Sequence, residues 1–188
     1  MHMESMTDQQ SRYTRVAIAL HWIIAALIII NFLLAAVGVD APKAEHDRLF
    51  GVHMATGILV QVLSVVWIIW RMFHPRPPFE PGIKPWEAAL AKVVHALFYV
   101  LVFALPFTGW LMVSLATGGL GVDMYGIFQW PGLPVGADRN AAGTVHELHE
   151  ILAISMFVLF LLHAGGALKH RIIDRDGTLA RMLPFLRR

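Results

Sequence analysis

The chain contains no cysteine among its 188 residues. This absence excludes disulfide bonds, iron–sulfur clusters held by thiolates, and haem attached covalently through a C-x-x-C-H motif. Charge is also scarce, because Asp, Glu, Lys and Arg make up only 15% of the residues, whereas a soluble domain has about 25%. Together with a mean hydropathy of +0.61, this scarcity predicts a surface that faces lipid rather than water.

Four apolar stretches without any Asp, Glu, Lys or Arg are long enough to cross a bilayer, which takes about 20 helical residues. They are Val16–Val39, Leu49–Trp70, Val93–Val122 and Ile151–Leu168. The first is too long for a signal peptide and lacks its small-residue cleavage site, so we interpret it as a helix. The sequence therefore predicts an all-α fold, a membrane four-helix bundle that forms one domain over residues 1–188, with spans at about 16–39, 49–71, 90–115 and 145–168.

Two of the connecting segments have an unusual composition. Residues 74–85 contain five prolines, which exclude a continuous helix or a central strand. Residues 117–143 are rich in Gly and Pro, and we expect this longest connection to be a folded surface loop. We predict that the fourth helix begins behind Thr144 as its N-cap, in a capping box with Glu147.

Basic residues predict the direction of the spans. Twelve of the fifteen Lys and Arg residues fall on the side that carries both termini, and only Lys43, Arg48 and Arg139 fall on the other. By the positive-inside rule both termini are cytoplasmic. The basic pI is then a topology signal with contacts to anionic lipid, and nucleic acid is excluded as a partner.

Ten histidines are many for a membrane protein of this length, and an ionisable residue inside a span is costly enough to be a functional candidate. Helix direction sorts six of them into an inner layer and an outer layer. The inner layer is His21, His95 and His163, and the outer layer is His53, His146 and His149. We interpret His2, His46 and His74 as surface residues, and His170 as either a solvated helix end or part of a site at the inner boundary.

The helical spacing of His149 and His163 connects the two layers. These residues are 14 positions apart, which is about 21 Å along a helix and only some 40° around it. His146 misses the same alignment by roughly 100°. A haem held by two histidines needs neutral imidazoles on opposite sides of the iron, from facing helices. The spacing therefore pairs His53 with His149 in the outer layer and His21 with His163 in the inner layer.

Other interpretations of these histidines stay open. A single buried histidine is more often a hydrogen-bonded contact between helices, as in a haem-free packing or transport protein. The sequence His146-Glu147-Leu148-His149 lacks the H-E-x-x-H spacing of a zinc site. His95 has no vacant partner, and it could replace His21 or His163 as a ligand, bond a haem propionate, or line a quinone pocket. Cations suited to propionates are Arg12, Arg15 and Arg71 on the inner side and Lys43, Arg48 and Arg139 on the outer side.

An ordered set of motifs extends from about Tyr13 to Pro184. It comprises Arg15, Ala19–Trp22, Val52–Gly57, Trp70–Arg71, Pro75–Pro78, His95–Tyr99, Leu105–Trp110, His149–Glu150, Leu162–Ala164, Asp176–Leu179 and Met182–Pro184. In these motifs the sequence resembles the bacterial cytochrome b561 family, small di-haem membrane cytochromes that include superoxide oxidase. A related larger group contains the cytochrome b subunits of nickel–iron hydrogenase and formate dehydrogenase.

The resemblance implies two b-type haems, one ligated by His21 and His163 and one by His53 and His149. It places quinone near the inner haem, where Arg71, His95 and His170 are possible quinone or propionate contacts. It further implies an oxidoreductase of the bacterial inner membrane that passes electrons between quinone and a one-electron donor on the periplasmic side, either a small molecule such as superoxide or a redox protein. The alternative is a membrane-anchor subunit of a multi-subunit hydrogenase or formate dehydrogenase.

Overall fold

A computed structural model describes residues 13–186 of the chain. Four long helices account for most of it: α2 (Arg15–Gly38), α3 (Lys43–Phe73), α4 (Pro85–Thr117) and α5 (Arg139–Lys169). All four have the length and the apolar composition of membrane spans. The structure thus confirms the predicted all-α membrane bundle.

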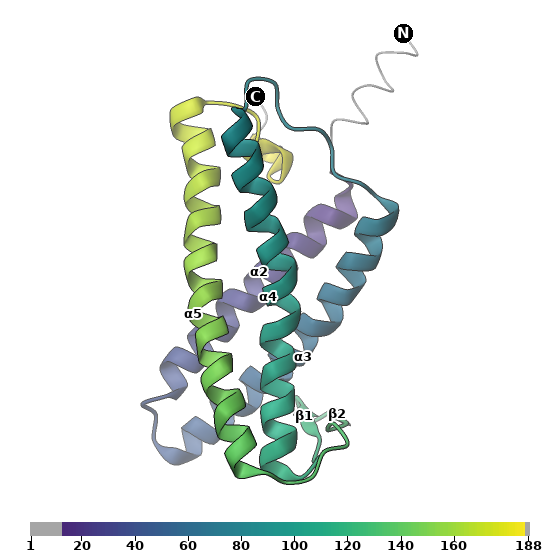
Figure 1. The fold of residues 1–188 in the computed structure, drawn as a ribbon, viewed down its shortest axis with the longest axis vertical. Coiled ribbons are helices and arrows are strands. Elements are labelled where there is room, and N and C mark those ends of the chain that lie inside the picture. The colour runs from purple at the N-terminus through teal and green to yellow at the C-terminus, as the bar shows by residue number, and fades with distance from the viewer. Residues whose placement is uncertain (1–12, 187–188) are drawn as a thin grey trace.

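The helices alternate in direction, so that each end of the bundle gathers two helix starts and two helix ends (Figure 1). We call the end where α2 and α4 begin and α3 and α5 finish the terminal end, because the described chain starts and finishes there. The opposite end carries the connection between α4 and α5, and we call it the hairpin end. Helix α4 packs on α5 and α2 packs on α3, while α3 also contacts α4.

The apolar core lies mainly between α4 and α5. Its buried residues are Val94, Leu101, Val102, Met156 and Leu159, and side chains of α2 pack against them. Most other apolar side chains point outward, as a lipid-facing surface requires.

Helices α3 and α5 extend beyond their apolar stretches at both ends, whereas α2 and α4 begin before theirs but end at Gly38 and Thr117, short of Val39 and Val122. Helix α5 also begins earlier than expected. Asp138 is its N-cap, since the Asp138 carboxylate accepts hydrogen bonds of 3.0 Å from the backbone N–H groups of Asn140 and Ala141. Thr144 lies inside the helix, where its hydroxyl donates to the carbonyl of Asn140. The prediction of Thr144 as N-cap is therefore wrong, because an aspartate six residues upstream satisfies the first backbone donors instead.

The long connection between α4 and α5 is a folded loop, as expected. It contains an antiparallel hairpin of β1 (Val122–Met124) and β2 (Phe128–Trp130), in which Val122 pairs with Trp130. Met124 is buried against α3 residues Ala55 and Ile58. The Tyr125 hydroxyl lies 3.0 Å from Oγ1 of Thr56, so the hairpin is fastened to α3 at both of these points.

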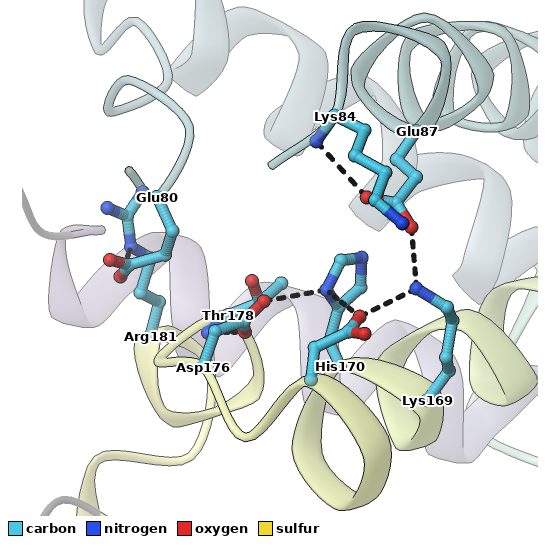
Figure 2. Close-up of polar contacts among 9 residues, drawn as sticks. Glu80, Lys84, Glu87, Lys169, His170, Asp176, Thr178 and Arg181 are labelled. Carbon is cyan, nitrogen blue, oxygen red and sulfur yellow. Dashed lines mark hydrogen bonds and ion pairs between the residues drawn. The ribbon is translucent and has the colours of Figure 1, made fainter. Parts of the chain in front are cut away.

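A polar network joins α5 to α4 at the terminal end (Figure 2). The Lys169 ammonium bridges Glu87 at the start of α4 (2.5 Å) and Asp174 (2.7 Å). Asp174 ends a single π-helical turn, η1 (His170–Asp174), that continues α5. The network fixes the start of α4 relative to the end of α5.

The segment after η1 folds back over the terminal end. It contains two short helices, η2 (Leu179–Arg181) and η3 (Pro184–Leu186). Arg181 of this segment bonds Glu80 of the proline-rich connection at 2.6 Å. The indole N–H of Trp22 donates to the carbonyl of Met182 at 2.8 Å. The tail is thereby attached next to His21, the neighbour of Trp22.

Candidate functional site

Two pairs of histidines face each other inside the bundle. At the hairpin end, His53 of α3 and His149 of α5 have ring centroids 6.3 Å apart. At the terminal end, His21 of α2 and His163 of α5 have ring centroids 6.2 Å apart. The structure thus brings together the same pairs that helix direction and phase predicted.

The hydrogen bond of His53 determines which of its ring nitrogens carries the proton. Its Nδ1 lies 3.0 Å from the backbone carbonyl oxygen of Asn31. A carbonyl can only accept a hydrogen bond, so Nδ1 carries the proton and Nε2 keeps its lone pair. This is the tautomer of a metal-ligating histidine, whose second nitrogen usually donates to a carbonyl or a similar acceptor.

His149 rests against a buried site on α4. Its Nδ1 lies 3.0 Å from Oγ1 of Thr108, and a Cβ added at Gly109 would meet His149 Cε1 at 3.2 Å. The ring therefore approaches the α4 backbone at a point where a larger residue would collide with it. Sequence reasoning missed both contacts, although Thr108 and Gly109 belong to the Leu105–Trp110 motif.

A third histidine joins the terminal-end pair. The ring of His95, on α4, lies 5.3 Å from that of His163, edge to face. Its Nδ1 is bonded to the carbonyl of Ala91 one turn earlier at 2.6 Å. His95 is thus held by its own helix beside the pair, with Nε2 as its remaining acceptor.

The spacing of both pairs suits an iron atom between two imidazoles. Two metal–nitrogen bonds of about 2.0 Å each, plus half of each ring, separate the ring centroids by roughly 6 Å. The His21–His163 and His53–His149 distances agree with this value, and the His95–His163 distance is shorter. The residues present therefore fit a group with two axial histidine ligands at each end of the bundle.

The interior also contains polar atoms that the described chain leaves unsatisfied. Buried and without a hydrogen-bond partner among residues 13–186 are Asn31 Oδ1, Gln61 Oε1, Ser64 Oγ and Trp67 Nε1. Unsatisfied polar groups are rare in a protein interior and commonly mark an additional bound group.

The remaining histidines lie outside the two pairs. His146 is exposed on α5, near Glu150 at 3.8 Å, as its phase predicted. His46 and His74 lie at helix ends but are half-buried, since their Nδ1 atoms bond the carbonyls of Gly38 and Trp70 at 3.0 Å. His2, like Arg12, falls outside the described residues.

His170 is part of the polar network of Figure 2 rather than a freely solvated residue. Its Nδ1 lies 2.7 Å from Asp176 and 3.1 Å from Asp174. Partial burial raises the pKa of the Asp176 carboxyl, but bonds from Thr178 and His170 lower it by more, so the net pKa is below its ordinary value. His170 is thus engaged by two carboxylates of the segment that follows α5.

An arginine-lined cavity opens at the terminal end. It has a volume of about 370 Å³ and is lined by Ile68, Arg71, Met72, Pro75, Arg76 and Tyr99. Arg76 donates to the Tyr99 hydroxyl at 3.1 Å, and Arg71 lies over the ring of Tyr13. Within residues 13–186 neither arginine forms an ion pair, so both can bind an anionic or carbonyl group.

Comparison with known proteins identifies the family. The model of prokaryotic cytochrome b561 matches residues 12–185. The chain belongs to the prokaryotic cytochrome b561 family. This cytochrome b561 is 32% identical over 183 residues to "Cytochrome b561 homolog 2" of Escherichia coli (strain K12), covering 95% of each chain.

Two further proteins of similar sequence carry different names. It is 30% identical over 175 residues to "Probable superoxide oxidase CybB" of Yersinia pestis, covering 92% of this chain and 96% of the relative. It is 29% identical over 181 residues to "Cytochrome b562" of Cereibacter sphaeroides, covering 93% and 97%. Family membership assigns b-type haem and transmembrane electron transfer to this multi-pass bacterial membrane protein, which has the lipid bilayer as a partner.

Proposed function

We propose that this cytochrome b561 holds two b-type haems and passes electrons across the inner membrane from a one-electron donor in the periplasm to quinone near the cytoplasmic side. His53 and His149 would hold the haem at the hairpin end, and His21 and His163 the haem at the terminal end. The main support is the presence of two facing imidazole pairs, whose ring centroids are 6.3 and 6.2 Å apart. The 14-residue step in α5 separates them by about 21 Å along the helix.

In this proposal the haems and the protein chain contribute different properties. Each haem supplies a one-electron redox change when it is bound. The chain would supply two neutral imidazoles to hold each haem, and a haem held in this way would serve electron transfer rather than oxygen binding. His53 and His149 are held in the ligating tautomer by Asn31 and Thr108.

The terminal end is the proposed cytoplasmic, quinone-binding end. Of the twelve Lys and Arg residues among residues 13–186, nine lie toward this end of the bundle, the distribution that the positive-inside rule associates with the cytoplasm. The cavity lined by Arg71 and Arg76 is there, and the buried indole N–H of Trp67 lies nearby, in a ring 5.9 Å from that of His21. These donors suit the carbonyl oxygens of a quinone or the propionates of the haem.

Superoxide is the proposed donor because one relative is named a probable superoxide oxidase. Attraction of an anion such as superoxide requires positive charge at the hairpin end, and most of the cations there are already paired. Lys43 and Arg48 are neutralised by Asp47 and Glu45 at 2.9 and 2.6 Å. Within the described chain, Arg139 is then the one cation on that side without an ion pair, so attraction of an anion would depend on it.

The test uses the purified protein in liposomes with ubiquinone. We expect two haems per chain by pyridine haemochromogen assay, and haem reduction by a superoxide source that superoxide dismutase abolishes and quinone reverses. One haem per chain would contradict the double site. Reduction that needs a co-purifying iron–sulfur protein instead of superoxide would favour the membrane-anchor alternative.

Gly109→Val tests the close approach of His149 to α4. The added methyl groups extend from a Cβ that already lies 3.2 Å from His149 Cε1, so they displace the imidazole from its position. We expect the haem content to fall from two per chain to about one, since overpacking shifts rigid neighbours. Gly143→Val on α5, whose Cβ would meet no atom within 4 Å, is the control and should keep both haems.

A further inference from the structure

Thr108 sits between the hairpin-end imidazole and the backbone of α4. It is buried, with an exposed fraction of 7%. Its Oγ1 lies 2.8 Å from the carbonyl oxygen of Leu105 and 3.0 Å from Nδ1 of His149. These two contacts make Thr108 a link between a helix carbonyl and a histidine ring.

The direction of each hydrogen bond follows from counting protons. The carbonyl of Leu105 can only accept, so the single hydroxyl proton of Thr108 goes to it. Oγ1 must then accept at His149, which requires that Nδ1 carries a proton. Nε2 of His149 is consequently unprotonated, like Nε2 of His53, and both can donate a lone pair to the same iron.

The two ends of the bundle differ in what the Nδ1–H groups of their paired histidines contact. An imidazole whose N–H donates to an acceptor becomes a more basic ligand, and a more basic ligand favours oxidised iron over reduced iron. Both hairpin-end ligands have acceptors of this kind, Asn31 for His53 and, for His149, Thr108 beside the carbonyl of Leu105. His21 and His163 contact aromatic rings, Trp22 and Phe98 among them.

We propose that Thr108 is a positioning residue that fixes the tautomer of His149 and, through the basicity of this imidazole, lowers the reduction potential of the hairpin-end haem. The proposal rests on the proposed ligation of that haem by His149. It assigns to the Leu105–Trp110 motif a role in tuning electron transfer, with Gly109 giving room for the ring and Thr108 giving the acceptor.

The experiment compares Thr108→Val with Thr108→Ser by redox titration of the purified holoprotein. Valine keeps the shape of threonine but removes the acceptor, whereas serine retains it. We expect valine to raise the potential of one haem, by about fivefold in the ratio of reduced to oxidised haem, which is about 40 mV at 59 mV per tenfold change. Serine should titrate like the wild type, and the second haem should be unchanged in both variants.

A matched control is Thr56→Val on α3. Thr56 is also buried, and its hydroxyl contacts the carbonyl of Val52 and the Tyr125 hydroxyl, but among residues 13–186 it forms no hydrogen bond to a histidine. Its replacement should therefore leave both potentials unchanged. Equal potentials in wild type and Thr108→Val would overturn the role of Thr108, as would the same shift in Thr108→Ser. If Thr108→Val fails to bind one haem, recovery of that haem in Thr108→Ser supports the proposal and its loss there contradicts it. A failure of the ligation itself is recognised separately, because His149→Ala would then retain both haems.

Discussion

His149→Ala is expected to reduce the haem content of the purified protein from two per chain to one. The chain has no cysteine, so no covalent bond retains a haem, and its hold depends on the two axial bonds and the surrounding packing. Removing one imidazole leaves a half-ligated haem in a widened interior. The pyridine haemochromogen assay against protein mass measures the loss directly.

His53→Ala should remove the same haem, because the proposed ligation places one haem between His53 and His149, whose ring centroids are 6.3 Å apart. The remaining haem should keep the spectrum and the potential that it has in the wild type, which also shows that the bundle is folded. The matched control is His146→Ala, an exposed histidine one turn away on α5, which should keep both haems. If His53→Ala and His149→Ala lose haems of different potential, the pairing is wrong.

The bundle and the histidine pairs could be predicted from the sequence because they depend on few variables. The absence of charge over about 20 residues identifies a span, and the distribution of Lys and Arg gives its direction. Direction and depth then sort residues such as His21 and His163 into a layer, and the 100° step of the helix tells whether His149 or His146 faces inward. None of these steps needs the distance between two helices.

The partners of the histidines could not be predicted in this way. Whether Thr108 reaches His149 depends on the rotation of α4 about its axis and on the distance between α4 and α5. The sequence around Thr108 is compatible with several rotations of α4, so it does not predict this contact. The prediction of Thr144 as the N-cap of α5 was wrong for a related reason. Asp138 and Thr144 both have side chains that cap helices well, and only the path of the loop before the helix decides between them.

The terminal-end network shows a second limit of sequence reasoning. Lys169 and Arg181 counted only as topology signals in the sequence, yet Lys169 joins α4 to α5 and Arg181 attaches the tail to Glu80. Ion pairs between segments that are 82 and 101 residues apart follow from the packed fold and from no local pattern. The same packing places the tail beside Trp22.

His21→Ala and His163→Ala are expected to remove the other haem, the one at the terminal end, and to leave the hairpin-end haem intact. Their rings face each other at 6.2 Å across the interior of the bundle. Assay of haem content and of the potential of the remaining haem distinguishes this loss from that caused by His149→Ala. The four single variants should therefore fall into two groups of two.

His95→Ala decides between the roles left open for the third histidine of that end. Its ring is only 5.3 Å from His163 and its Nδ1 is held by Ala91, so we expect it to serve the quinone rather than the iron. The variant should keep two haems per chain, while reoxidation of reduced haem by quinone slows by roughly a hundredfold or more, the loss typical of a removed proton donor or acceptor. A variant that loses the terminal-end haem while His21→Ala keeps it would make His95 the ligand. Unchanged reoxidation by quinone, with both haems present, would instead exclude His95 from the quinone site.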